Sequence, residues 1–407
     1  MLGAIIGDIV GSRFEFDNHR SKFFEFFSAE SYFTDDTVMT LAIAKAIMIT
    51  WKQLIDEENT DEIYARSPLD HPDFYDVLAQ NTIKSMQTFG HEYPNMSYGM
   101  NFRTWIFADN PQPYNSFGNG SAMRVSPVAY IARGEKELLK LAETVTAVTH
   151  NHPEGIKGAQ ATAIAIYKAL RDEPIDEINS FITQNYYPLD FTLDEIRSTY
   201  QFNETCQGTV PQALQSFFES DSFEDTIRTA VSIGGDSDTL AAITGSIAEA
   251  YYSIPPKLAN KALSYLDEKL LGIYNEWLTF LLTDIKIGLV LTSHFKKQNL
   301  FFSLLPVEKT GLKHVMISSD IFYHATDDNV GRLHESFVLD DEESTIMMVK
   351  EGWENIEYIQ QIRVTKNLDP IILGFEKLLS SPNWIDRPIP PFRFFQPYFQ
   401  ISASYEN

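Results

Sequence analysis

The chain contains little cysteine, little positive charge and no long uninterrupted apolar runs. A single cysteine among 407 residues excludes a disulfide framework. With 32 lysines and arginines against 56 aspartates and glutamates, the formal net charge of −24 argues against long nucleic acids as partners, because such a surface repels phosphate. No apolar run of membrane-spanning length and no signal-peptide pattern is evident, so we expect a cytoplasmic protein without a membrane partner.

Two short segments combine threonine with aspartates, and each precedes an apolar helix. The first is FTDDT at 33–37, followed by VMTLAIAKAIMI, and the second is GGDSDT at 234–239, followed by LAAITGSIAEAYY. One carboxylate at a helix N-terminus is explained as a cap, but two acids and a threonine beside a buried helix need further compensation. The alternative is a pair of ordinary helix caps.

The donor chemistry of these segments predicts a metal site. Hydroxyl and carboxylate oxygens without histidine or cysteine suit hard cations such as Mg²⁺ or Mn²⁺ and argue against zinc. Two such ions could be held together, as in two-metal sites. The predicted ligands are Thr34, Asp35, Asp36, Asp236, Asp238 and Thr239.

Residues 3–16, GAIIGDIVGSRFEF, combine a stripe of small residues with two acids. Glycines recur at every fourth position, which allows a second helix to pack closely. For Asp8 we favour a hydrogen-bonded core acid over a catalytic role. Glu15 lies between Phe14 and Phe16, an apolar setting that would raise its pKa toward use as a general acid or base. The alternative for Glu15 is a loop residue beside Arg13.

Two further segments could bind an anion. In NSFGNGSAMR, Gly118 and Gly120 bracket Asn119 just before a predicted helix, and a glycine turn of this kind presents backbone N–H groups to a diphosphate. Such turns are also common without a ligand. In THNHPEG, Pro153 fits the first helical position, so His150 precedes the cap and is free to face a cleft.

Together these motifs resemble a known family. FTDDT, NGSAMR at 119–124, THNHPEG at 149–155 and GGDSDT occur in the order found in the ADP-ribosylglycohydrolase family, and GAIIGDIVGSRFEF is similar to its N-terminal helix and glutamate-bearing loop. The resemblance covers about residues 2–275. It implies an all-α domain and a metal-dependent hydrolase that cleaves the C1″ glycosidic bond between ADP-ribose and an acceptor, reversing ADP-ribosylation.

The resemblance also implies roles for individual residues. The glycine turn would hold the phosphates and a ribose, with His150 against the ligand, and the metals would orient the distal ribose. The base would be Glu15 or a metal-bound water held by Asp35 or Asp36. The implied substrate-binding residues are Gly118, Asn119, Gly120, Ser121, Met123 and His150, and the implied catalytic residues are Glu15, Asp35, Asp36 and Asp238.

More than one substrate and more than one class of reaction are compatible with the sequence. The partner would be an ADP-ribosylated protein or a small-molecule ADP-ribose conjugate, with arginine, serine, a base or O-acetyl-ADP-ribose as the acceptor. The acidic surface mildly favours a guanidinium-bearing acceptor. The other hypotheses are a hydrolase of an ADP-ribose or nucleotide phosphoester, and a toxin-neutralising ADP-ribose binder.

Two smaller expectations concern residues outside these motifs. We expect Cys206 to be a buried, unreactive residue, because no base or second cysteine accompanies it. The aromatic residues of the 98–117 region are expected to pack within the protein rather than to stack on an adenine.

The composition of the sequence changes near Thr292, from alanine-rich helical segments to segments rich in β-branched and aromatic residues. Residues 1–290 are predicted to form the helical hydrolase domain, and residues 296–407 a smaller α+β domain of unknown role. HVMISSDIFYH, STIMMVKEG and EYIQQIRV favour strands, and DPIILGFEKLLSS favours a helix. The proline- and aromatic-rich end is expected to dock on its own protein, with a protein partner as the alternative.

Overall fold

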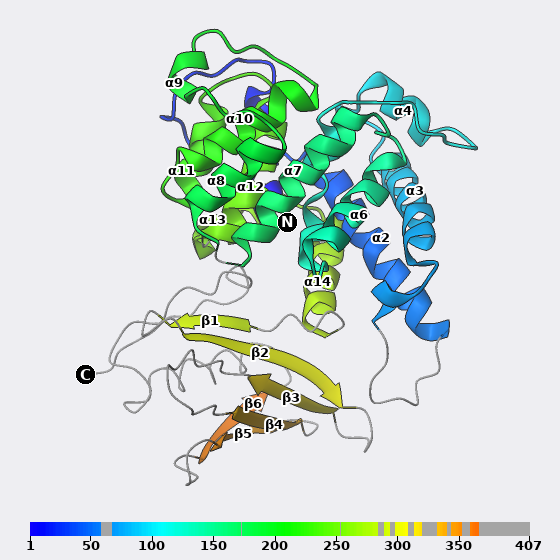
Figure 1. Ribbon diagram of the computed structural model, residues 1–407, viewed down its shortest axis with the longest axis vertical. Coiled ribbons are helices and arrows are strands. Elements are labelled where there is room, and N and C mark those ends of the chain that lie inside the picture. The colour runs from blue at the N-terminus through cyan, green and yellow to red at the C-terminus, as the bar shows by residue number, and fades with distance from the viewer. Residues whose placement is uncertain are drawn as a thin grey trace. The chain divides into compact units, whose positions relative to one another are not determined.

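The computed structural model describes residues 1–57, 67–171, 173–252 and 254–283, together with six strands between residues 289 and 365 (Figure 1). Between residues 1 and 283, the described part of the chain contains helices and one isolated bridge, between Gly118 and Thr205, but no strand. The all-α prediction for this region is therefore confirmed. The helices are α1 (Leu2–Gly11), α2 (Asp35–Glu57), α3 (Phe74–Glu92), α4 (Met100–Ile106), α5 (Gly120–Met123), α6 (Glu135–Ala147), α7 (Pro153–Ala169), α8 (Ile175–Asn185), α9 (Leu193–Ile196), α10 (Cys206–Phe218), α11 (Phe223–Val231), α12 (Ser237–Tyr251), α13 (Pro256–Leu263) and α14 (Glu268–Thr283).

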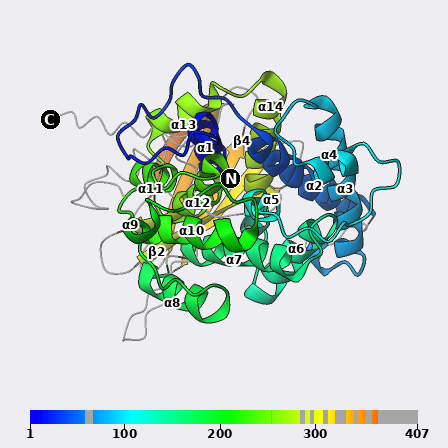
Figure 2. The same ribbon diagram turned by 90° about the horizontal axis from the view of Figure 1, so that it is seen from above.

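Helix α12 is the centre of this helical unit. It is buried on all sides from Ser237 to Ala248, as its alanine-rich sequence predicts, and it packs against α1, α7, α10 and α11 (Figure 2). Small residues permit this crowding because they bring helix backbones close together.

The tightest of these contacts joins α1 to α12. Each glycine of α1 faces the backbone of α12: Gly3 lies against Gly245, Gly7 against Ala241, and the last glycine of α1 against Ser237. The two helices are antiparallel, because residue numbers rise along one as they fall along the other. The prediction that the small-residue stripe lets a second helix pack closely is confirmed.

Helix α2 is a core helix that packs against α3. By length and composition, its segment Asp35–Ile55 could cross a membrane, with a mean hydropathy of 1.4, yet 72% of that apolar window is buried inside the protein. The expectation that no apolar segment reaches membrane-spanning length was therefore wrong. The few charges of this helix are explained by its burial in the protein core.

The six strands form one antiparallel sheet in the order β1-β2-β3-β4-β5-β6. They are β1 (Leu289–Ser293), β2 (Gln298–Val307), β3 (Lys313–Ser319), β4 (Arg332–Leu339), β5 (Glu343–Glu351) and β6 (Ile359–Thr365). In each pair the strands are neighbours in sequence; β4 and β5, for example, pair Phe337 with Ile346. Strands β3, β5 and β6 fall in segments that favour strands.

By its internal contacts the chain divides into two compact units, Met1–Trp277 and Leu278–Asn407. The helix expected in DPIILGFEKLLSS lies outside the described residues. The α+β class of the second domain, and a boundary between residues 290 and 296, stay predictions.

Candidate active site

The GGDSDT segment makes a sharp turn into α12. Gly234 and Gly235 have φ values of 69° and 76°, in the left-handed region that glycine tolerates without strain. Asp236 takes the N-cap position, but its side chain makes no capping hydrogen bond. Instead it accepts a hydrogen bond of 2.6 Å from Nδ2 of Asn119. The ordinary-cap alternative therefore does not account for this buried carboxylate.

The N-terminus of α2 is satisfied by an acid from another helix. Asp8, on α1, accepts hydrogen bonds from the backbone N–H groups of Thr34 and Thr37, at 2.9 and 3.0 Å, and from both threonine hydroxyls. Asp8 is thus the hydrogen-bonded core acid that we expect from the sequence. Because it supplies the cap, Asp35 and Asp36 are not needed for that purpose.

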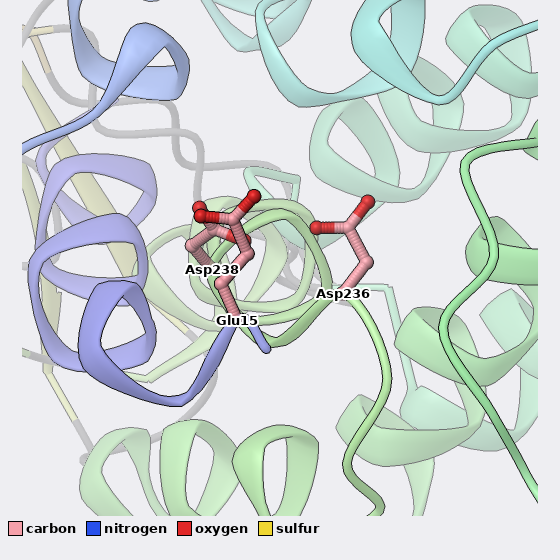
Figure 3. Close-up of side chains that lie close together, drawn as sticks. All are labelled: Glu15, Asp236 and Asp238. Carbon is pink, nitrogen blue, oxygen red and sulfur yellow. The ribbon is translucent and has the colours of Figure 1, made fainter. Parts of the chain in front are cut away.

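The two predicted metal-binding segments meet at the N-termini of α2 and α12. The hydroxyl of Thr239 donates to Oδ2 of Asp36 at 3.2 Å, which joins residues 203 positions apart. Glu15 comes from the loop after α1, and its carboxylate lies with those of Asp236 and Asp238 so that one oxygen of each falls within 4.8 Å of the others (Figure 3). These three separate segments together form an acidic cluster, which consists of Glu15, Asp35, Asp36, Asp236 and Asp238.

The acidic cluster lines a cavity of about 660 Å³, a size typical of small-molecule sites. The cavity wall includes most of the residues singled out from the sequence: Glu15, Asp35, Asp36, Gly118, Asn119, Gly120, Met123, His150, Asp236, Asp238 and Thr239. Two of them do not line it. Thr34 is buried with its hydroxyl on Asp8, and the hydroxyl of Ser121 donates to the carbonyl of Gly155 at 2.9 Å.

Burial gives the acidic cluster unusual protonation energetics. Burial raises the pKa of Glu15 to about 8, and the nearby charge of Asp236 adds to the effect. Burial likewise raises the pKa of Asp35 to about 7, and it holds the pKa values of Asp36 and Asp238 well above the ordinary range. Carboxylates gathered away from water resist ionisation because each lacks solvation and repels its neighbours.

The local positive charge does not balance these acids. In the described part of the chain, Arg124 is the only lysine or arginine that lines the cavity. Two buried oxygens, Oε2 of Glu15 and Oδ1 of Asp36, have no hydrogen-bond partner among the described residues. An oxygen-rich cluster with unpartnered carboxylate oxygens fits a hard cation, since a bound ion would compensate both the charge and the missing contacts.

The glycine turn also lines the cavity and lies against His150. Added Cβ atoms at Gly118 and Gly120 would lie 3.3 and 3.6 Å from Nε2 of His150. The N–H groups of Gly118 and Asn119 are already used, donating to Ser116 Oγ and to the carbonyl of Glu204. An anion at this turn would therefore depend on the remaining N–H groups and on the imidazole.

His150 is a buried, neutral imidazole. Burial, with a contribution from Arg124, lowers its pKa well below the ordinary value. Its Nδ1 lies 2.7 Å from the hydroxyl of Thr149 and 3.4 Å from Nη2 of Arg124. Because a guanidinium only donates, Nδ1 acts as an acceptor and the ring proton is on Nε2, the atom that faces the glycine turn.

Sequence reasoning missed the residue that fastens the Glu15 loop. Arg20 donates to the backbone carbonyls of Arg197, Tyr200 and Ile233, and thereby ties the loop to the segment before the GGDSDT turn. Asn18, at a φ of 48°, accepts from the N–H of Gly235 at 3.1 Å. These contacts hold Glu15 beside Asp236 and Asp238.

The helical unit thus brings acids from two helix N-termini and a glycine turn into one cavity. The chain belongs to the ADP-ribosylglycohydrolase family, whose model matches residues 1–281. The family resemblance seen in the motifs is thus confirmed.

Several relatives carry related names. The chain is 23% identical to ADP-ribosylhydrolase ARH3 of Xenopus tropicalis, with 67% of this chain and 94% of that protein covered. It is 25% identical to the ADP-ribosylarginine hydrolase Tri1 of Pseudomonas putida, with 64% of this chain and 72% of that protein covered. A solved structure described as an ADP-ribosylglycohydrolase-related protein complex matches with a TM-score of 0.47 and 21% identity, covering 69% of this chain and 97% of that chain.

Proposed function

We propose that this protein hydrolyses the C1″ glycosidic bond between ADP-ribose and an acceptor, and so reverses ADP-ribosylation. The observation that carries the proposal is the acidic cluster and the glycine turn in the wall of one cavity, joined by the hydrogen bond from Asn119 to Asp236. Family membership and the names of the relatives support the same reaction.

The cavity suggests how an ADP-ribose group would lie. Its distal ribose would occupy the acidic cluster. The diphosphate would reach the glycine turn, where Nε2–H of His150 is a donor and Arg124, next to Nδ1 of His150, contributes positive charge. Asn119 links the two groups, because its side chain donates to Asp236 while the glycines on either side of it lie against His150.

The acidic cluster is the proposed site of two Mg²⁺ or Mn²⁺ ions. The residues that would hold them are Asp35, Asp36, Asp236, Asp238 and Thr239, with Thr34 as a further predicted ligand that here donates to Asp8. When bound, such ions supply positive charge that holds and polarises the ribose hydroxyls.

The reaction itself needs a proton acceptor and stabilisation of positive charge. The C1″–acceptor bond breaks, a water oxygen bonds to C1″, and one water proton passes to the acceptor. Glu15 is the proposed base, because its Oε2 has no partner among the described residues and its carboxylate faces the cluster. Asp238 and its neighbours would stabilise the oxocarbenium-like transition state through their negative charge.

The test is a release assay on the full-length chain with a panel of ADP-ribosylated acceptors, run with Mg²⁺, with Mn²⁺ and with a chelator. Intact ADP-ribose and free acceptor are the expected products, and the chelator should stop their formation. Formation of AMP, by cleavage of the diphosphate, or of inorganic phosphate, by cleavage of a phosphoester, would instead indicate a phosphohydrolase, and binding of ADP-ribose without release would indicate a binding protein.

A pair of variants sharpens this assay. Asp238→Ala should abolish release because it removes a carboxylate from the acidic cluster. Asp190→Ala is the matched control, since Asp190 is exposed and lies outside the cavity wall. Near-normal release by Asp238→Ala would refute the proposed mechanism.

A further inference from the structure

Two exposed aromatic rings stack in the cavity wall next to Glu15. Phe16 and Phe202 have ring centroids 5.6 Å apart and planes 28° apart, and both line the cavity. They are nevertheless 76% and 37% exposed, so the stack is open to solvent on its outer side. Single exposed aromatics need no explanation, but a stacked pair at the edge of a polar cavity offers a ready-made binding surface.

The pair comes from two loops that also bear acids. Phe16 directly follows Glu15, and Phe202 lies two positions before Glu204, another residue of the cavity wall. Glu204 is tied to the site through its backbone, whose carbonyl accepts from the N–H of Asn119 at 2.7 Å. Its side chain is exposed and belongs to the wall of the same cavity as the stack.

We infer that Phe16, Phe202 and Glu204 form the subsite for the acceptor, and that this subsite selects the guanidinium of an ADP-ribosylated arginine. The inference rests on the proposed function, in which the distal ribose occupies the acidic cluster and the phosphates extend toward His150. The bond at C1″ then lies at the acidic cluster, and the acceptor leaves past the aromatic stack.

The chemistry of the subsite matches a planar cation. Aromatic faces attract a guanidinium through cation–π contact, and a flat ring also stacks on its flat plane. The exposed carboxylate of Glu204 adds the negative charge that a neutral acceptor would not use. A serine acceptor has neither a charge nor a plane with which to exploit these groups.

The bond changes are balanced for this acceptor. The C1″–N bond breaks, the water oxygen bonds to C1″, one water proton moves to the departing guanidine nitrogen, and the other stays on the new 1″-hydroxyl. The acceptor is a cation both before and after cleavage, so the subsite keeps its contacts throughout the reaction.

The experiment compares two substrates on the full-length chain: peptides of the same sequence that carry ADP-ribose on arginine or on serine. Phe202→Ala and Phe16→Ala should raise the KM for the arginine-linked peptide about 5- to 10-fold through the lost cation–π contact. Phe202→Trp should retain the wild-type KM, because the ring face is kept. Glu204→Gln should raise the same KM, and added salt should shrink that difference.

Two controls separate the subsite from general damage. Phe23→Ala changes a phenylalanine of the same loop as Phe16, 94% exposed and away from the cavity wall, and should leave both KM values unchanged. The affinity for free ADP-ribose should stay the same in every variant. An equal rise in KM for both peptides, or release from the serine-linked peptide alone, would overturn the inference while leaving the proposed hydrolase function standing. Release from neither peptide, with no binding of ADP-ribose, would overturn both.

Discussion

Replacing Gly7 by alanine tests whether the contact between α1 and α12 sets the geometry of the acidic cluster. A Cβ added at Gly7 would lie 2.6 Å from the backbone nitrogen of Ala242 and closer still to the carbonyl of Ala241. An ordinary contact begins at 3.4 Å, so the neighbouring backbone must move by at least 3.4 − 2.6 = 0.8 Å. Backbone in the middle of a buried helix cannot rotate aside as a side chain can.

The expected cost follows from two opposing terms. Overpacking of a close-packed interior costs about 3 kcal/mol at the upper end of its usual range, and this site belongs there because the obstacle is backbone. Alanine in place of glycine recovers about 1 kcal/mol of helix propensity. The net destabilisation should therefore be about 2 kcal/mol. Because α1 leads to Glu15 and α12 begins beside Asp238, kcat should fall as well.

Denaturant unfolding followed by far-ultraviolet circular dichroism measures the change. Gly272→Ala in α14 is the matched control, since a Cβ there meets nothing within 4 Å. That variant should gain about 0.5–1 kcal/mol from helix propensity alone. A Gly7→Ala protein that unfolds at the wild-type denaturant concentration or above it would refute the reasoning.

Three further predictions concern the cavity. With metal chelated, stability should fall as pH rises, because burial raises the pKa of Asp35 from 3.8 to about 7. The favourable contribution of Asp35 to the free energy of unfolding is complete below about pH 4 and is lost as the pH rises past about 7. Thermal melting across that pH range measures the loss. Excess Mg²⁺ or Mn²⁺ should stabilise the wild type by about 2.7 kcal/mol at 100 times the Kd, and Asp36→Asn should lose this gain; equal melting shifts in both proteins would contradict it. His150→Ala should weaken ADP-ribose binding about tenfold through one lost hydrogen bond, measurable by calorimetry, and an unchanged Kd would count against the proposed position of the diphosphate.

The sequence was sufficient to predict the meeting of the two acidic segments. Each consists of aspartate and threonine at the start of a helix with no polar face, and burying both helices in one core brings their N-termini together. The hydrogen bond between Thr239 and Asp36 joins the two segments. The periodicity of glycine in α1 likewise predicted its close contact with α12.

Other features depend on contacts that leave no pattern along the chain. Asp8 caps α2 from another helix, although Thr34 and Asp35 are the better local candidates. Arg20 donates to three backbone carbonyls. Because every residue has a backbone carbonyl, the sequence does not indicate which of them would accept these hydrogen bonds. The direction of the Ser121 hydroxyl, toward Gly155 and not the cavity, was equally beyond pattern analysis.

The lone cysteine gives the protein a built-in reporter of opening at the glycine turn. Cys206 is buried, as we expected, with Sγ 3.1 Å from the carbonyl of Gly118 and 3.3 Å from the hydroxyl of Ser121. Burial raises the pKa of the thiol to about 12, so the closed protein presents almost no thiolate to an alkylating reagent. The rate of alkylation therefore measures how often the turn and α10 separate. A ligand that rests on the turn should slow it, and since the chain has no second thiol, the whole signal comes from this one place.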